Sequence, residues 1–431
     1  MAASLAEQLE LSDAHEPDID RCINKGVADR TFSAAGCTAS IGERIFHRSA
    51  HGSLQHPPPL RRIGTDTLFD LASLTKPLAT GLAALWLSSR SQLDLGASIT
   101  RTLPEFRHER AFADITIDML LDHTAGFPAT KDFWKRVHED DLRTHPDHRV
   151  AGTAKAKSKM LELLLETPLE NRAGTKTVYS DIGYMVLGWV IEHVVGRPLD
   201  VWLTREIYRP LGIDNELFFV RLDDARARQR LRRRSFAATE ECAWRGCMLQ
   251  GEVHDPNAWV LGGVAGHAGL FGTADAVWVL AHRLWQCYQG EDRFFLSGGV
   301  RRFWTRSRRT PGTTRTLGWD TPSANLSMSG KRFSLTSVGH LGFTGCSLWI
   351  DLSTGVIGVV LCNSAHPTPD GKQEAMSAFR PRVYDLIAKY GESQPKDPAK
   401  PTGAQAFYSG AGVGLSIPLH NPLRGPRKPG S

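Results

Sequence analysis

The chain has 431 residues and a mass of 47.5 kDa, long enough for one large domain or for roughly two to four smaller ones. Its 41% hydrophobic and 23% charged residues are ordinary globular usage, which excludes a collagen-like or wholly disordered chain. Lys plus Arg number 52 and Asp plus Glu 46, and this surplus of +6 is mild for the length, so we expect no nucleic-acid partner.

Hydrophobic periodicity and turn residues predict the elements in chain order. A helix is expected within 1–30, then strands at 35–41 and 44–49, and a strongly apolar helix at 73–89. Further helices are predicted at 115–121, 158–165, 179–195 and 201–208. Strands return at 347–350 and 356–361, and a closing helix follows at 382–390, with Pro381 at its first position.

Strands therefore lie at both ends of the chain and helices between them, which predicts an α+β fold. We expect the end strands to form one antiparallel sheet flanked by helices, with a mostly helical lobe at about 93–330. Residues 1–18 are an N-terminal extension and 19–390 one domain. The last 41 residues, 391–431, hold seven prolines and seven glycines, a composition that predicts a disordered tail.

The N-terminus and the cysteines bear on location. The first residues are polar and acidic, without the basic start and apolar run of a signal peptide, and no apolar run approaches the ~18 residues of a membrane span. Seven cysteines are few for this length, and only Cys242 and Cys247 lie close together, in a C-x4-C spacing that is a poor zinc signature. These features predict a soluble cytoplasmic protein with reduced thiols and no membrane contact.

Three short motifs carry candidate chemistry. In the first, Ser73-Leu-Thr-Lys76 opens the apolar helix, so Ser73 and Lys76 share one helical face. A desolvated Lys76 could accept the serine proton. The alternative is an N-capping Ser73 with a solvated Lys76, although the leucines and phenylalanine around the motif leave a solvated lysine little room.

The second motif, Tyr179-Ser-Asp181, heads another apolar helix. A tyrosine near a lysine ammonium can act as an acid or a base. The alternative is that Tyr179 packs in the core and Asp181 caps the helix.

The third motif is the glycine-rich stretch 339–345, which includes His340, Gly342 and Phe343. Glycines let the backbone approach a ligand closely, and a backbone N–H here could donate to an oxyanion. The alternative is a simple glycine turn with a surface histidine.

The three motifs, in this order, resemble the boxes of the penicillin-recognising serine hydrolases, in the branch of class C β-lactamases, DD-peptidases and esterases. Flanking stretches resemble the same branch: FDLASLTKPLAT, LLDHTAGFP, YSDIGYMVLGWVIE, GGVAGHAGLFGTA and GHLGFTGCSLWID. The resemblance covers about residues 20–390. It implies the β-lactamase/transpeptidase-like fold and a hydrolase that forms an acyl-enzyme. We expect no cofactor and no metal.

The resemblance also implies roles for single residues. Ser73 corresponds to the acylated nucleophile, Lys76 to its general base and Tyr179 to the group that passes a proton to the leaving group. The backbone N–H groups of Ser73 and Phe343 would form the oxyanion hole. Substrate would contact Asp181, His340 and Gly342, with a protonated His340 holding an anionic group.

Two departures from the family pattern bear on the substrate. Asp181 stands where β-lactamases more often have Asn, and an ionised carboxylate cannot donate a hydrogen bond. Leu341 stands where Thr or Ser is usual, which removes a hydroxyl. Both favour a small ester, amide or D-peptide as the substrate over efficient turnover of β-lactams. A penicillin-binding sensor with slow deacylation is the alternative.

Two further features stay open. The six arginines in 226–234 predict either a solvated basic loop or a phosphate or nucleic-acid patch. His254, Asp255 and His267 lie near one another in the sequence, but without the spacing of a metal-binding motif.

Overall fold

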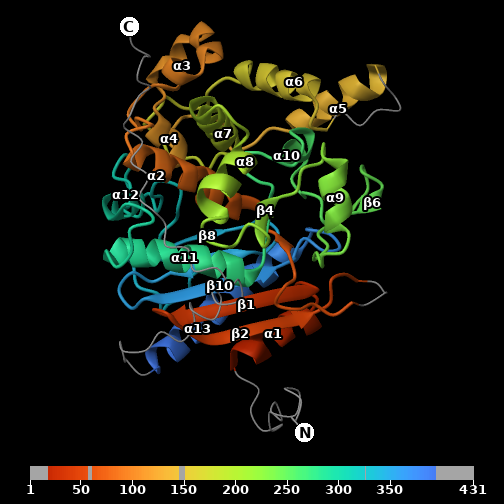
Figure 1. The fold of residues 1–431 in the computed structure, drawn as a ribbon, viewed down its shortest axis with the longest axis vertical. Coiled ribbons are helices and arrows are strands. Elements are labelled where there is room, and N and C mark those ends of the chain that lie inside the picture. The colour runs from red at the N-terminus through yellow and green to blue at the C-terminus, as the bar shows by residue number, and fades with distance from the viewer. Residues whose placement is uncertain (1–17, 57–60, 145–150, 326, 395–431) are drawn as a thin grey trace, which may run out of the picture.

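The computed structural model describes residues 18–56, 61–144, 151–325 and 327–394. Its centre is a five-stranded antiparallel sheet with strand order β2-β1-β10-β9-β8 (Figure 1). The strands are β1 (Ala34–Ile41), β2 (Arg44–Gly52), β8 (Val338–Leu341), β9 (Ser347–Ile350) and β10 (Val356–Cys362). The predicted α+β fold and the pairing of the two chain ends are therefore confirmed, since β1 lies directly beside β10.

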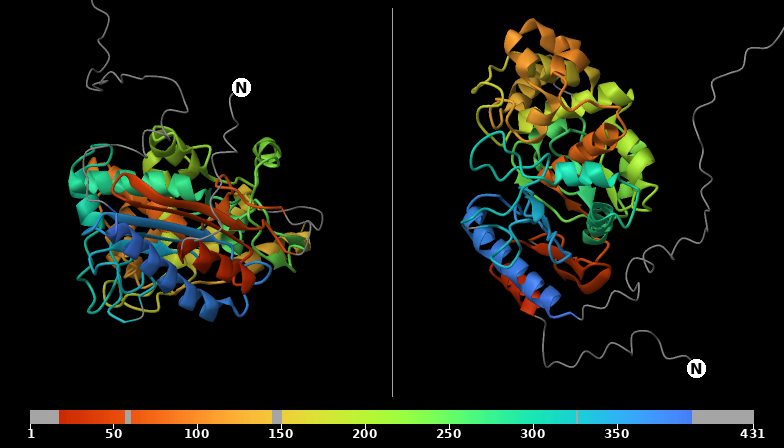
Figure 2. Two further views of the ribbon diagram at one scale, coloured as in Figure 1. Left: turned by 90° about the horizontal axis from the view of Figure 1, so that it is seen from below. Right: turned by 90° about the vertical axis from the view of Figure 1, so that its left-hand side faces the viewer.

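Helices cover both faces of this sheet. α1 (Asp18–Ala28) and α13 (Lys372–Glu392) contact each other on one face, as Figure 2 shows, and α11 (Ala274–Gln289) lies on the other. Successive side chains of β10 alternate between the two cores: Val360 packs toward the terminal helices and Val359 and Leu361 toward the main core. A strand buried on both faces reads as a continuous apolar run, which explains the sequence of β10.

The remaining helices form the lobe above the sheet in Figure 1. They are α2 (Gly81–Ser89), α3 (Ile99–Thr102), α4 (Ile117–Leu121), α5 (Phe133–Thr144), α6 (Ala154–Leu165), α7 (Asp181–Val195), α8 (Leu199–Leu203), α9 (Ala225–Leu231), α10 (Pro256–Val260) and α12 (Ser297–Phe303). Short pieces join them: the 3₁₀ turns Ala72–Leu74, Pro104–His108 and Arg110–Asp114, and the π-helical turns Lys76–Thr80 and Thr204–Tyr208.

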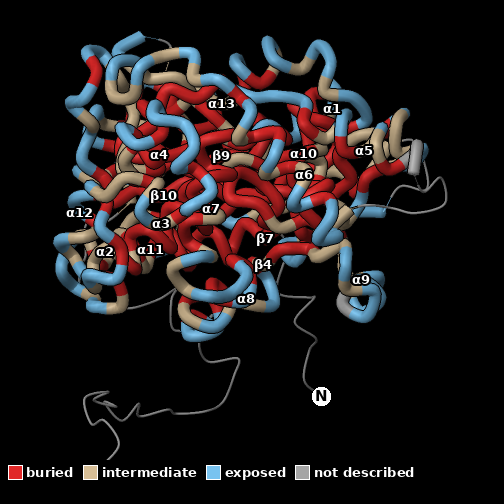
Figure 3. The backbone as a smooth tube through the Cα atoms, turned by 90° about the horizontal axis from the view of Figure 1, so that it is seen from above, coloured by how far each residue is buried: buried red, intermediate tan, exposed pale blue. Residues whose placement is uncertain are grey.

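Two small sheets complete the fold. β3 (Phe69–Asp70), β7 (Leu270–Gly272) and β4 (Leu217–Phe219) pair in the order β3-β7-β4, and β5 (Glu241–Cys242) pairs with β6 (Cys247–Met248). Figure 3 shows that the buried backbone is concentrated where the sheet, α7 and α11 meet. Within the described residues no helix is both long and apolar enough to cross a membrane.

Three predicted helices differ from the structure, and one of them, at 201–208, is divided between α8 and the π-helical turn Thr204–Tyr208. The helix predicted at 73–89 is three successive pieces, a 3₁₀ turn, a π-helical turn and α2. The closing helix was predicted to start behind Pro381, but α13 begins at Lys372 and holds Pro381 inside it. A proline costs one helical hydrogen bond, and the buried stripe of Phe379, Val383 and Ile387 spans the proline and outweighs that loss. The predicted tail lies outside the described residues from 395 onward.

Candidate functional site

Ser73 lies in a turn that a buried carboxylate organises. Asp70, at the end of β3, accepts a hydrogen bond from the backbone N–H of Ala72 at 2.9 Å and another from that of His254 at 2.7 Å. Ala72 has φ +46°, a conformation that costs a residue with a side chain about 1–3 kcal/mol. Thr344 donates to the Asp70 carbonyl at 2.6 Å and ties the third motif to the same turn. These contacts therefore hold the turn in one strained conformation, and Ser73 is half-buried in it.

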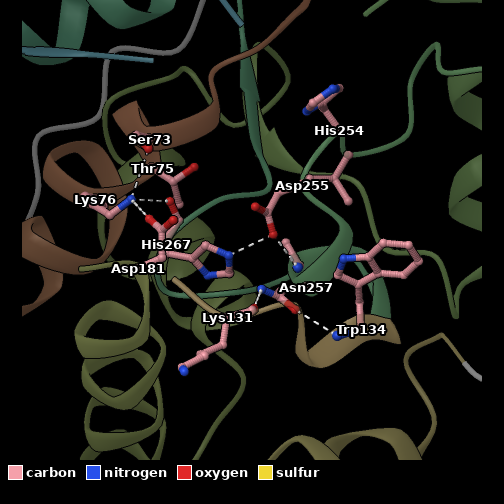
Figure 4. Close-up of polar contacts among 12 residues, drawn as sticks. Ser73, Thr75, Lys76, Lys131, Trp134, Asp181, His254, Asp255, Asn257 and His267 are labelled. Atoms are coloured by element: carbon pink, nitrogen blue, oxygen red, sulfur yellow. Dashed lines mark hydrogen bonds and ion pairs between the residues drawn. The ribbon is translucent and has the colours of Figure 1, made fainter. Parts of the chain in front are cut away.

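Lys76 is completely buried, and three acceptors surround its amine (Figure 4). Nζ lies 3.0 Å from Ser73 Oγ, 2.7 Å from Asp181 Oδ1 and 3.1 Å from the backbone carbonyl oxygen of His267. Burial alone would lower the pKa of Lys76, but the charge of Asp181 outweighs it and holds the pKa above the ordinary 10.5. Lys76 therefore rests as an ammonium paired with Asp181, and the alternative of a solvated lysine is wrong.

Tyr179 lies beside this pair, just before α7. The centroid of its ring is 4.9 Å from Lys76 Nζ and 4.6 Å from the ring of His123. His123 has φ +61° and accepts the backbone N–H of Ser180 through Nδ1 at 3.1 Å, which fixes the loop beneath Tyr179. Ser180, and not Asp181, caps α7 by accepting from the N–H of Gly183. Asp181 is thereby free to face Lys76.

The third motif approaches the turn that holds Ser73 from the opposite side. His340 is the third residue of β8, and Gly342 follows the strand. A Cβ added to Gly342 would meet the Leu71 carbonyl oxygen at 2.6 Å, so only glycine permits this approach. Phe343 is 60% exposed and its ring stacks on His254, with centroids 5.4 Å apart. In the described part of the chain the backbone N–H of Phe343 has no backbone acceptor, which leaves it available as a donor.

His340 does not lie where a cation is favoured. Its side chain is buried, Nδ1 is 2.8 Å from the Leu341 carbonyl oxygen, and Nε2 has no partner among the described residues. Burial, followed by the charges of Arg315 and Lys76, lowers the pKa of His340 well below 6.5. The predicted role as a protonated anion holder is therefore not supported, because desolvation disfavours the charge and two cations are already present.

Arg315 is a second cation at the site besides Lys76, and the sequence motifs did not reveal it. Its guanidinium carbon lies 4.8 Å from the centroid of Tyr179, and its Nη1 is 3.5 Å from Asp320. Arg315 stands in an irregular loop where Asp320 pairs with Gly339 of the third motif. Only this tertiary pairing brings it to the site, since no spacing in the sequence links it to the three motifs.

A chain of polar contacts runs from Lys76 through the buried His267 to the partly exposed Asp255. The backbone carbonyl oxygen of His267 accepts a hydrogen bond from Lys76. The ring Nε2 of His267 pairs with Asp255 Oδ1 at 2.8 Å (Figure 4). Asp255 caps α10 by accepting the N–H of Ala258 at 2.7 Å. Burial would raise the pKa of Asp255, but His267 and the cap lower it below its ordinary value. Asp255 and His267, which lack the spacing of a metal-binding motif, therefore support the buried amine of Lys76.

The arginine-rich segment 226–234 lies away from these contacts. The segment of six arginines forms α9 and the turn after it, and three of the six, together with Arg61, border a surface hollow of about 570 Å³. Among the described residues, no group of three or more His, Cys, Asp or Glu side chains is placed to hold a metal ion.

Comparison with known proteins places this geometry in a family. The beta-lactamase family model matches residues 19–380. A protein of Escherichia coli (strain K12), provisionally named a D-alanyl-D-alanine carboxypeptidase, is 32% identical over 403 residues, 86% of this chain and 87% of its own. The N-acetylmuramyl-L-alanine amidase of Bacillus subtilis (strain 168) is 30% identical over 399 residues, 87% and 86% of the two chains.

Solved structures share the fold at low identity. EstCE1, described as a hydrolase with promiscuous acyltransferase activity, has a TM-score of 0.64 at 19% identity and covers 86% of this chain and 97% of its own. A class C beta lactamase has a TM-score of 0.62 at 16% identity, with 85% and 96% covered. The β-lactamase/transpeptidase-like fold expected from the motifs is thus confirmed, and the chain belongs to the beta-lactamase family of serine hydrolases.

Proposed function

We propose that the protein hydrolyses a small ester, amide or D-peptide through an acyl-enzyme on Ser73. The observation that carries this proposal is the 3.0 Å contact between Ser73 Oγ and Lys76 Nζ in a buried setting. Ser73 Oγ attacks the substrate carbonyl and gives its proton to Lys76, once Lys76 has lost one of its own. The backbone N–H groups of Ser73 and Phe343 stabilise the oxyanion. Tyr179 passes the proton to the leaving group and then activates water for deacylation.

The substrate class follows from the relatives and from the charge at the site. The names of the two relatives, a carboxypeptidase and an amidase, both denote cleavage of an amide bond at alanine. Arg315 offers a cation beside Tyr179, which suits a substrate with a carboxylate. These points favour a peptide-like amide over a simple ester as the natural substrate.

Activity-based labelling tests the proposal. The full chain is incubated with a fluorescent fluorophosphonate, and turnover is then measured on p-nitrophenyl esters, D-peptides and nitrocefin. Labelling together with turnover of an ester or D-peptide supports the proposal. A folded protein that is neither labelled nor active on any substrate overturns it.

A slowly deacylating binding protein is the second candidate, because Asp181 and Leu341 depart from the pattern of efficient β-lactamases while Ser73 and Lys76 remain in contact for acylation. The two candidates differ in their kinetics. A burst of one product equivalent followed by negligible turnover identifies the binding protein, and sustained turnover identifies the hydrolase.

We expect short-chain esters to be hydrolysed with a higher kcat/KM than nitrocefin. The Asp181 carboxylate faces Lys76 and has no N–H to offer a β-lactam side chain, and Leu341 offers no hydroxyl to its carboxylate. Initial rates on p-nitrophenyl acetate and nitrocefin at one pH measure this preference. A higher kcat/KM for nitrocefin contradicts the interpretation of these two residues.

We expect Arg315→Gln to raise KM for a D-peptide with a free carboxylate about tenfold or more, since a hydrogen bond to a charged group contributes about 1.5–3 kcal/mol. KM for a neutral p-nitrophenyl ester should stay unchanged. Arg308→Gln, an exposed position in the same loop region, is the matched control. Equal changes for both substrates would show that Arg315 only supports the fold.

A further inference from the structure

The hairpin β5–β6 places two cysteines directly opposite each other. Cys242 of β5 and Cys247 of β6 are register partners in this antiparallel pair. The turn between them is tight, with φ +65° at Gly246 and its N–H donating to the Cys242 carbonyl oxygen at 2.9 Å. Facing residues of an antiparallel pair have Cα atoms about 4.5–5.5 Å apart and side chains on one face.

This spacing lies within the roughly 4.4–6.8 Å that a disulfide needs between its Cα atoms. Both cysteines are free thiols in the structure; Cys242 is buried and Cys247 is exposed. The other five cysteines are buried free thiols. The chain thus has one cysteine that solvent reaches, and it faces a second one across the hairpin.

We propose that Cys242 and Cys247 are a reversible redox pair that closes into a cross-strand disulfide. The oxidant is a low-molecular-weight disulfide of the glutathione class. The Cys247 thiol loses its proton to solvent and its thiolate attacks the oxidant, forming a mixed disulfide and releasing one thiolate, which takes up a proton. The Cys242 sulfur, deprotonated in turn, attacks Cys247 Sγ and expels the second thiolate. Two protein thiols are oxidised and one external disulfide is reduced to two thiols.

The order of attack follows from exposure. The mixed disulfide must form at Cys247, because Cys242 is buried and burial raises the pKa of its thiol. Once Cys247 carries the glutathione, the Cys247 sulfur lies opposite Cys242 across the same hairpin, where Cys242 can attack it.

The β5–β6 hairpin also contacts the segment that leads to Asp255 and His267. Arg245, in the turn, is almost fully buried and donates to the carbonyl oxygens of Val253 at 2.6 Å and His254 at 2.9 Å. The residue after His254 is Asp255, which pairs with the ring of His267. The backbone carbonyl oxygen of His267 in turn accepts a hydrogen bond from Lys76. A bond between facing cysteines keeps the register that the hairpin already has, so closure should leave this connection and kcat/KM unchanged while it fastens the turn.

Peptide mapping of the intact protein tests this proposal. The folded protein is treated with oxidised glutathione, the free thiols are blocked, and it is digested with trypsin without reduction. Trypsin cuts after Arg245, between the two cysteines, so the disulfide appears as two linked peptides that a reductant separates. The expected result is that linked pair, the loss of two titratable thiols, and their return with reduced glutathione.

Two single variants give the controls. Cys242→Ser should stop the reaction at a stable glutathione adduct on Cys247, and Cys247→Ser should leave all remaining thiols titratable. A wild-type protein that only accumulates the adduct on Cys247, or that does not react at all, overturns the proposal. A disulfide between two protein molecules, or one involving another cysteine, overturns it as well. None of these outcomes depends on the chemistry at Ser73.

Discussion

Replacing Ser73 with alanine should abolish covalent labelling by a fluorophosphonate and lower kcat by roughly 10³- to 10⁶-fold. The hydroxyl of Ser73 lies 3.0 Å from the buried Lys76 amine, at the top of a strained turn that Asp70 and Thr344 hold in place. Without the Oγ atom no acyl-enzyme can form there. Only binding and oxyanion stabilisation then remain to act on a water molecule.

This variant should still fold. Lys76 keeps Asp181 and the His267 carbonyl oxygen as acceptors, and Ser73 is only half-buried. Ser377→Ala, an exposed serine on α13, is the control and should be labelled like the wild type. Mass spectrometry of the labelled wild type locates the adduct. An adduct on a different serine would contradict the mechanism.

Asp181→Asn should move the acid limb of the kcat/KM profile to lower pH by about one to three units, the usual effect of one opposite charge at this distance. The Asp181 carboxylate lies 2.7 Å from Lys76 Nζ and raises the pKa of Lys76. Activity needs Lys76 without its extra proton, so it rises with pH as Lys76 titrates. Removal of the anion lowers the pKa of Lys76, and the active form then appears at lower pH.

The quantity to compare is the shift of the acid limb between variants and not its absolute position, because an apparent pKa in a cluster of ionisable groups does not belong to one residue. The measurement is kcat/KM for one neutral ester across the pH range, so that the charge of the substrate does not enter. Asp181→Glu keeps the negative charge and should keep the acid limb at high pH. Asp132→Asn, which removes an exposed carboxylate outside the site, is the second control and should also leave the acid limb in place. An acid limb that stays in place or moves up in Asp181→Asn would show that Asp181 is not the counter-ion controlling Lys76.

Local patterns in the sequence were sufficient for much of the fold. The apolar runs of β1 and β10, the apolar faces of α7 and the order of strands and helices indicated an α+β fold with a sheet formed by both ends of the chain. These features depend on side-chain periodicity and turn residues, which operate over a few positions. The proline inside α13 was misjudged, because the sequence shows the lost hydrogen bond and not the packing that compensates for it.

The contacts of the candidate site are likewise of two kinds, those between neighbours in the sequence and those that only the fold creates. Ser73 and Lys76 are three residues apart, so their contact is a local property of one turn, and the motif predicted it. The partners of Lys76 are not local: Asp181 lies 105 residues away and the carbonyl oxygen of His267 lies 191 residues away. The resemblance to the family implied that Asp181 contacts substrate, whereas in the folded chain Asp181 is the counter-ion of Lys76.

The charges of the site were decided by tertiary structure alone. The resemblance to the family implied a cationic His340, whereas its burial and the nearby charges of Arg315 and Lys76 favour the neutral ring. Arg315 belongs to no motif and reaches Tyr179 through a pairing of Asp320 with Gly339. A sequence states which groups can ionise, whereas the free energy of each charge depends on desolvation and on neighbours brought from distant positions. For this protein the sequence determined which ionisable and nucleophilic residues are available for the proposed acyl transfer, and the fold determined which of them carry charge.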